Sequence, residues 1–372
     1  VFFTARPRQI VFESGIGKQY SDSPKQIYQQ MLTDPTFKDY NFIWIYNGYD
    51  IEKDKRLKIV KRFSWEYFYY LATSKYWVNN QNFPHYIHKP RHTTFLQTWH
   101  GTPLKKMMND VDDFADKDDG YVPMMNKVNS QWDYLVSPSR YATEKFQSAF
   151  HPKAEILEVG YPRNDVFFMS STKKNEVLRQ LRNMWGINNK KVILYAPTFR
   201  DNEKTSTGKQ DFKLNLNIEE MFNALHEDYV VLFRQHAIVK TKLYIPDYFK
   251  NFFIDVSTFS DVQQLYLLAD ICITDYSSVM FDYAITKKPL LFYVYDYEDY
   301  KDNLRGFYID FEAEAPGPLL YNTKQLIEAV QNIEEVKRIS NTKYEQFYQK
   351  YGYIENGTST KKVIDAVWKD IK

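Results

Sequence analysis

Two histidines, His100 and His236, stand at equivalent places in the sequence, each directly after a short apolar run that predicts a β-strand. Thr94–Trp99 precedes the first histidine, and Val230–Gln235 precedes the second. An imidazole can take and give a proton near neutral pH, so each residue is a candidate general base. Polar residues are also ordinary at strand ends, and taken alone each position fits a structural, hydrogen-bonding histidine better.

A pair of serines, Ser277-Ser278, follows the strand-like residues 271–274 and opens a helix-like segment. Hydroxyls at this position accept hydrogen bonds from the free N–H groups of the first helical turn. The positive end of the helix dipole at the same place attracts a phosphate. The pair is therefore interpreted either as an ordinary helix cap or as part of a phosphate site.

Two arginines, Arg200 and Arg234, also end predicted strands in the second half of the chain. Two cations close to the Thr198 hydroxyl suit a diphosphate. The sequence contains no Walker motif and no Gly-x-Gly-x-x-Gly, which argues against an ATPase and against an ordinary dehydrogenase.

Three histidines, His85, His88 and His92, cluster within a short polar loop punctuated by proline. No carboxylate or cysteine stands close to them, and their spacing fits no zinc site, so we expect a solvated loop and no metal. The one cysteine, Cys272, lies inside a predicted strand. It excludes an internal disulfide framework and indicates a reducing compartment and a buried structural thiol.

The composition predicts a folded protein of two domains, because 372 residues exceed what one hydrophobic core usually serves. A net charge of +2 does not indicate nucleic-acid binding. No apolar run approaches the roughly 20 residues that span a bilayer, and no signal peptide opens the chain, so we expect a soluble or peripheral protein. The first predicted strand begins almost at Val1, as expected of a fragment of a longer chain.

The order of predicted elements indicates an α/β fold with two facing Rossmann-like domains and a ligand cleft at the carboxyl ends of their strands. We place the first domain at residues 1–172, the second at 173–345 and a C-terminal helical crossover at 346–372. Helices expected at about 323–349 and 358–371 would cover and tie the two lobes.

An insertion in the first domain, about residues 104–132, loses the periodicity of its surroundings. It contains two methionine pairs, Met107-Met108 and Met124-Met125, which fit either core filler or an apolar contact surface. It also contains a cluster of acidic residues: Asp110, Asp112, Asp113, Asp116, Asp118 and Asp119.

Several blocks of this sequence resemble the CDP-glycerol glycerophosphotransferase family, the primases and polymerases of teichoic acid. In chain order the blocks are Gln97–Lys106, Gly160–Asp165, Tyr195–Arg200, Ile273–Ser278, Arg305–Tyr308 and Pro316–Pro318. Ala237 departs from the family pattern, which places a proline after the second histidine.

The resemblance implies a GT-B-like fold, a CDP-alditol donor, no catalytic metal or other cofactor, and peripheral attachment to the cytoplasmic face of the bacterial membrane. It also implies that His100 and His236 are the functional histidines. Around them we expect substrate to be bound by Gly101, Thr102, Thr198, Arg200, Arg234, Asp275, Ser277, Ser278, Asp282 and Arg305.

The predicted reaction transfers glycerol phosphate or ribitol phosphate from the CDP-alditol to a hydroxyl of a lipid-linked teichoic acid or capsule-type polymer, with release of CMP. His100 acts as the base, and His236 orients or stabilises the transferred phosphate. Two alternatives are a nucleotide-sugar glycosyltransferase of the same fold and a non-catalytic module that binds anionic wall polymer. The sequence leaves open the choice of alditol, the number of units added and the oligomeric state.

Overall fold

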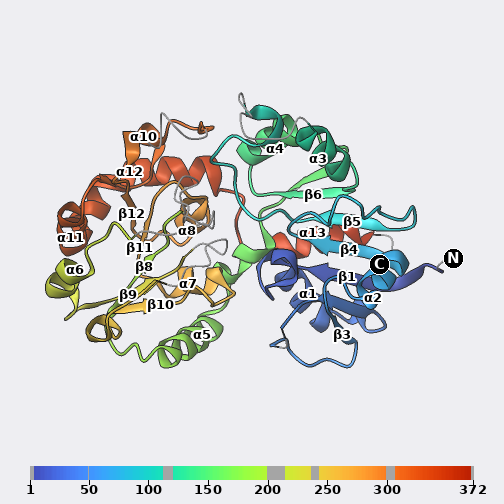
Figure 1. Cartoon of the computed structure of the whole chain (residues 1–372), viewed down its shortest axis with the longest axis horizontal. Helices are drawn as coiled ribbons and strands as arrows, with labels where there is room; N and C mark the ends of the chain where they lie inside the picture. The colour runs from blue at the N-terminus through green and yellow to red at the C-terminus, as the bar shows by residue number, and fades with distance from the viewer. Residues whose placement is uncertain are drawn as a thin grey trace. The chain divides into compact units, whose positions relative to one another are not determined.

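The computed structural model describes residues 4–48, 50–111, 120–198, 214–235, 243–298 and 306–369. The chain forms two compact units (Figure 1). The first unit comprises Val1–Phe168 together with Tyr353–Lys372, and the second comprises Met169–Gly352. The predicted divisions follow residues 172 and 345, whereas those of the structure follow Phe168 and Gly352.

The first unit is built on a seven-stranded sheet, counted over the described residues, in the order β3-β2-β1-β4-β5-β6-β7. All of its paired strands are parallel. The order reverses between β1 and β4, because the chain builds outward on one side of β1 and then on the other. The strands are β1 (Arg6–Glu13), β2 (Asn41–Ile45), β3 (Leu57–Val60), β4 (Ser74–Asn79), β5 (Thr94–Gln97), β6 (Tyr134–Ser137) and β7 (Glu155–Glu158).

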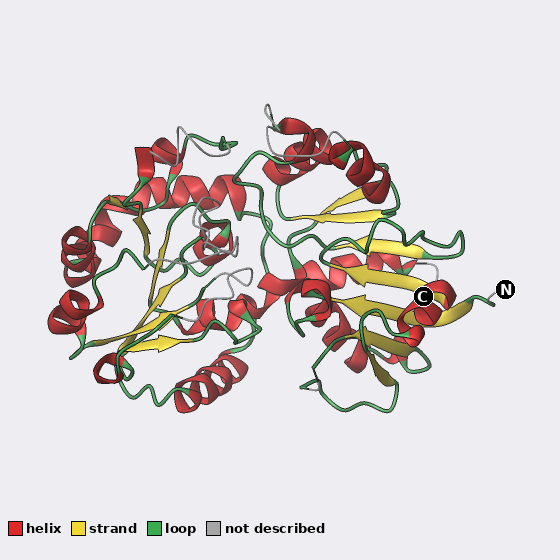
Figure 2. Cartoon of the chain, in the orientation of Figure 1, coloured by secondary structure: helices red, strands yellow, loops and turns green. Residues whose placement is uncertain are grey.

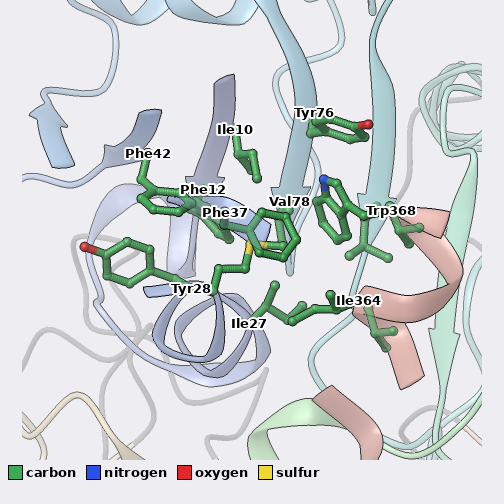
Figure 3. Packing of buried hydrophobic residues seen from close by; sticks show 14 of the residues in the cluster. Ile10, Phe12, Ile27, Tyr28, Phe37, Phe42, Tyr76, Val78, Ile364 and Trp368 are labelled. Atoms are coloured by element: carbon green, nitrogen blue, oxygen red, sulfur yellow. The ribbon is translucent and has the colours of Figure 1, made fainter. Parts of the chain in front are cut away.

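One face of this sheet is covered by helices from both ends of the chain, α1 (Asp22–Thr33) and α13 (Ser359–Val367) (Figure 3). Successive strand residues point to opposite faces, so Phe12 reaches this core and stacks on Trp44 with ring centroids 5.5 Å apart. Ile364 and Trp368 complete the same core. The C-terminal segment is therefore an integral part of the first unit.

Two carboxylates, Glu355 and Asp165, fasten this C-terminal segment to the short helix η4 (Pro162–Phe168) and the residue before it. Glu355 is 3% exposed and accepts hydrogen bonds from Tyr161 N at 2.9 Å and Asn164 Nδ2 at 3.0 Å. Asp165 accepts from Ser359 N at 3.0 Å, at the start of α13. These bonds satisfy backbone donors that a loop and a helix end otherwise leave free.

The remaining long helices of the first unit are α2 (Trp65–Thr73), α3 (Tyr121–Asn129) and α4 (Arg140–Phe150). Ser64 caps α2 by accepting from Tyr67 N at 3.2 Å. Helix α3 lies within the expected insertion, where the residue pattern shows no helical period. Pro123 and its asparagines weaken the helix signal, although proline is tolerated in a first turn.

The second unit has a six-stranded parallel sheet in its described part, ordered β10-β9-β8-β11-β12-β13. This order repeats the arrangement of a dinucleotide-binding fold, with its reversal between β8 and β11. The strands are β8 (Lys191–Tyr195), β9 (Tyr229–Phe233), β10 (Phe253–Asp255), β11 (Ile271–Thr274), β12 (Leu290–Tyr293) and β13 (Leu319–Leu320).

Helices flank the strands of both units (Figure 2). In the second unit they are α5 (Ser171–Met184), α6 (Ile218–Leu225), α7 (Val262–Leu268), α8 (Val279–Ala284), α10 (Phe311–Glu314), α11 (Thr323–Gln331) and α12 (Ile333–Tyr351). The single helix expected over about 323–349 is divided at Asn332, and Val330 and Ile333 on either side both enter the second core. None of the helices in the described ranges is long and apolar enough to cross a membrane.

Candidate functional site

His100 follows β5 through a strained turn. The backbone of Trp99 has φ of +54°, which is a rare conformation for a bulky side chain. Aromatic packing holds it there, since the Trp99 ring lies 4.7 Å from Phe150, 6.0 Å from Phe146 and 6.2 Å from Trp132 between ring centroids. Such strain persists only where surrounding contacts impose it, and it often accompanies a functional residue.

The turn after His100 is supported by burial and by one hydrogen bond. Gly101 and Thr102 are buried, and the carbonyl of Pro103 accepts a hydrogen bond from Tyr141 Oη at 2.7 Å. Substrate binding by Gly101 and Thr102 stays a prediction.

The imidazole of His100 is oriented by the backbone of Asn80, the residue that follows β4. His100 Nδ1 lies 2.7 Å from the Asn80 carbonyl oxygen. A carbonyl can only accept, so Nδ1 carries the hydrogen and Nε2 of the neutral ring keeps its lone pair. This is the arrangement that a general base requires.

The pKa of His100 lies below its ordinary value, because the surrounding protein removes part of the ring's hydration. The hydrogen bond to Asn80 and the negative charge of Asp22 oppose this shift, whereas the positive charge of Arg163 adds to it. The side chain nevertheless has an exposed surface, so its desolvation is only partial. A lowered pKa keeps His100 neutral, and thus able to accept a proton, at neutral pH.

Three residues that act on His100 were not predicted as site residues from the sequence: Asp22, Asn80 and Arg163. Asp22 reads there as part of a helix start, and Asn80 as the polar end of a strand. Arg163 lies in the block Gly160–Asp165, one of those that resemble the family, and this position could have marked it as a site residue.

In the second unit, Thr198 and Asp275 are brought together across the reversal of strand order. Thr198 follows β8 and donates to Asp275 Oδ1 from its backbone N at 2.9 Å and from its hydroxyl at 2.5 Å. Asp275 follows β11 and is 2% exposed. Ligands of open parallel sheets bind at this reversal, outside the carboxyl ends of the strands.

The serine pair follows Asp275 on the same connection. Ser277 Oγ accepts from Val279 N at 3.3 Å, as a helix cap does, whereas Ser278 makes no side-chain cap hydrogen bond. Both serines are half-buried. Asp282 lies further along α8 and is 6% exposed. Ser277 therefore acts as a helix cap, and phosphate binding by the serine pair stays a prediction.

Arg234 follows β9, the neighbour of β8. Its backbone N donates to Tyr195 O at 2.9 Å, and its Nη1 donates to the carbonyl of Phe259. Burial lowers the pKa of the guanidinium, and Tyr266 and Asp261 oppose the shift. An arginine keeps its proton in proteins, so Arg234 supplies a positive charge at the carboxyl edge of the sheet.

Several predicted residues lie outside the described ranges: His236, Arg200, Arg305, Asp112, Asp113, Asp116, Asp118 and Asp119. Within those ranges no group of three or more His, Cys, Asp or Glu residues could hold a metal ion. His85 and His88 are exposed, and His92 is half-buried.

The family model of CDP-glycerol:poly(glycerophosphate) glycerophosphotransferases matches residues 1–369. This chain belongs to that family. The family predicted from the motif blocks is therefore confirmed, and so is the prediction of a transferase enzyme.

Named relatives extend this comparison. A teichoic acid poly(glycerol phosphate) polymerase of Bacillus spizizenii is 44% identical over 364 residues, which are 96% of this chain and 91% of the relative. A polymerase of the same name from Staphylococcus epidermidis is 40% identical over 99% of this chain, which spans only 51% of that relative. A teichoic acid ribitol-phosphate primase of Bacillus spizizenii is 29% identical over 96% of this chain and 90% of its own length.

Among solved structures, the wall teichoic acid polymerase TagF matches with a TM-score of 0.90 and 40% identity, over 99% of this chain and 90% of that chain. Together with the parallel sheets of both units, this match confirms the predicted α/β class of two Rossmann-like domains.

Proposed function

We propose that this glycerophosphotransferase-family chain moves glycerol phosphate from CDP-glycerol to a terminal hydroxyl of a poly(glycerol phosphate) acceptor and releases CMP. The observation that carries the proposal is the oriented imidazole of His100, with its Nε2 lone pair available, in a chain that matches the family over residues 1–369. Glycerol is favoured over ribitol because the 44% identical relative is named for glycerol phosphate, against 29% for the ribitol-phosphate primase.

In this proposal the first unit serves the acceptor. His100 Nε2 takes the proton of the acceptor hydroxyl while the oxygen forms a bond to the phosphorus that carries glycerol. The bond from that phosphorus to the oxygen of CMP breaks, and CMP leaves with the electron pair. His236, which lies outside the described residues, is assigned to the transferred phosphate.

The second unit binds the donor in the same proposal. Positive charge from Arg234 and hydrogen bonds from the serine pair stabilise the pyrophosphate, a part that a metal ion plays in many phosphoryl transfers. Thr198, Asp275 and Asp282 shape this region, and Arg200 and Arg305 add charge from outside the described ranges. The proposal assigns no metal or other cofactor to the reaction.

We extend the proposal to peripheral attachment at the cytoplasmic face of the membrane. The support is an aromatic face on the first unit, defined here as Phe63, Trp65 and Phe68, which are 51%, 81% and 40% exposed. Exposed Lys61 adjoins it in the sequence. Aromatic side chains beside a cation suit the headgroup region of an anionic bilayer. The four methionines of the expected insertion are half-buried, so their contact with acceptor or lipid stays a prediction.

The proposed function is tested with a donor panel. Purified protein and a short poly(glycerol phosphate) acceptor are incubated with CDP-glycerol, CDP-ribitol and UDP-sugars, and release of CMP or UDP is measured. We expect CMP release with CDP-glycerol, and we expect it to survive excess EDTA. UDP release alone would indicate a glycosyltransferase, donor binding without release would indicate a binding module, and EDTA inactivation that Mg²⁺ reverses would contradict a metal-free reaction.

His100→Ala should lower kcat on the order of 10²–10⁴-fold, because a general base typically contributes that much. Affinity for CDP-glycerol should stay near wild type, since the base acts on the acceptor. Steady-state kinetics and a donor titration measure the two quantities. The control is His85→Ala, an exposed histidine of the same unit. An equal loss of donor affinity in the His100 variant would remove the assignment.

The double variant Ser277→Ala/Ser278→Ala should raise KM for the donor while leaving the melting temperature near that of the wild type. The reason is that only Ser277 makes a cap hydrogen bond, at 3.3 Å, so little folding energy depends on the pair. Kinetics and thermal melting are compared with Ser340→Ala, a half-buried serine of α12. If the double variant chiefly loses stability with KM unchanged, the serines are caps alone.

Replacement of the aromatic face by serine at Phe63, Trp65 and Phe68 should reduce co-sedimentation with anionic liposomes. Activity on a short soluble acceptor should be unchanged, because Phe63 and Phe68 pack on Tyr67 of α2, an element that carries none of the predicted site residues. Tyr244→Ser, at an 82% exposed position of the second unit, is the control. A parallel variant with serine at Met107, Met108, Met124 and Met125 tests the insertion. Unchanged sedimentation of both variants would contradict attachment through these surfaces.

A further inference from the structure

We propose that Asp22 is a positioning residue for His100 and that Arg163 is the counter-charge that holds Asp22 in place. The inference rests on the proposed function, because it takes His100 as the base. It adds a charged pair that is linked to the imidazole through Asn80.

Asn80 joins His100 to the loop between β1 and α1. Its backbone carbonyl meets His100 Nδ1 at 2.7 Å, while its side-chain amide is bonded at both ends. The amide oxygen accepts from Gly15 N at 3.1 Å, and Nδ2 donates to Asp22 Oδ2 at 2.7 Å and to Ser14 Oγ at 3.2 Å. An amide held at both ends fixes its own backbone, so Asp22 helps to set the direction in which His100 points.

Asp22 is itself held in an unusual geometry. Its φ of +65° is left-handed, a conformation that aspartate tolerates better than most residues. One carboxylate oxygen accepts from Ser23 N at 2.6 Å, and Arg163 Nη1 lies 3.4 Å from each oxygen. The Arg163 side chain is 5% exposed, and its guanidinium lies 4.5 Å from the centroid of the Tyr161 ring. Both carboxylate oxygens of Asp22 and its backbone are thus held in place.

A need for stability does not explain this pair well. Removing two charges from water is costly, and an apolar pair of similar volume is often as stable or more so. A role toward His100 explains it directly, because the two charges act on the imidazole in opposite senses. After desolvation and the Asn80 hydrogen bond, Asp22 raises the pKa of His100 and Arg163 lowers it.

During transfer the balance of these charges matters. His100 becomes an imidazolium when Nε2 takes the proton of the acceptor hydroxyl, and the nearby carboxylate of Asp22 then stabilises the new positive charge. The Asn80 carbonyl keeps the Nδ1 hydrogen in place throughout. Asp22 therefore favours the protonated product of the proton transfer without leaving its own hydrogen bonds.

The test compares Asp22→Asn with Asp34→Asn, a carboxylate of the same unit that accepts only from a local turn, Thr36 N at 2.9 Å. Histidine labelled at Cε1 reports the pKa of His100 by NMR, with the signal assigned through His100→Ala. We expect Asp22→Asn to lower this pKa and to reduce kcat about tenfold or more, yet by less than the roughly 10²–10⁴-fold that loss of the base costs. KM for the donor should stay unchanged.

Arg163→Met gives the opposite prediction for the same signal, because it removes a positive charge and should raise the pKa of His100. The double variant Asp22→Asn/Arg163→Met leaves no unpaired buried charge and serves if either single variant fails to fold. It should retain the low kcat of Asp22→Asn, since the carboxylate is missing.

A His100 pKa that stays fixed in the folded single variants, or a wild-type kcat in Asp22→Asn or in the double variant, would overturn the proposal. The NMR titration needs no substrate. If no CDP-alditol is turned over, the proposed function fails in the donor panel, while the titration still reports whether Asp22 and Arg163 act on His100.

Discussion

The reversal of strand order in each parallel sheet is the constraint on which the candidate sites depend. At β1 and β4 in one unit, and at β8 and β11 in the other, successive connections leave the sheet in opposite directions. The carboxyl ends of these strands are therefore left open between their connections. Asn80 and Asp22 meet at the first opening, and Thr198 and Asp275 meet at the second.

The two openings have the same arrangement of strands but carry different side chains. Around His100 the charges of Asp22 and Arg163 oppose each other, and Asn80 links Asp22 to the imidazole, which suits the control of a proton. Around Arg234 and the serine pair, positive charge and hydroxyl groups suit an anionic ligand. In the proposed function, one architecture thus supports a basic catalyst in one unit and anion binding in the other.

The sequence predicted the parallel sheets of both units and the position of His100 at a strand end, because short β-branched runs and the polar residues that end them are local signals. The two-residue strand β13 was not predicted, since so short a run carries no such pattern. The hydrogen bond between Asn80 and Asp22 joins residues 58 positions apart, and the pair of Arg163 with Asp22 spans 141 positions. No local pattern encodes such contacts. Helix α3 and the division at Asn332 were missed for a related reason, since packing on neighbouring elements decides them more than propensity does.

The return of the chain to the first unit has a consequence for biosynthesis. Trp368 and Ile364 belong to the core around Phe12, and Glu355 bonds to Tyr161, which lies 194 positions earlier. The ribosome therefore finishes the whole of Met169–Gly352 before it supplies the residues that close the first core. The second unit, which is continuous in sequence, can mature during translation, whereas the unit that begins first is completed last.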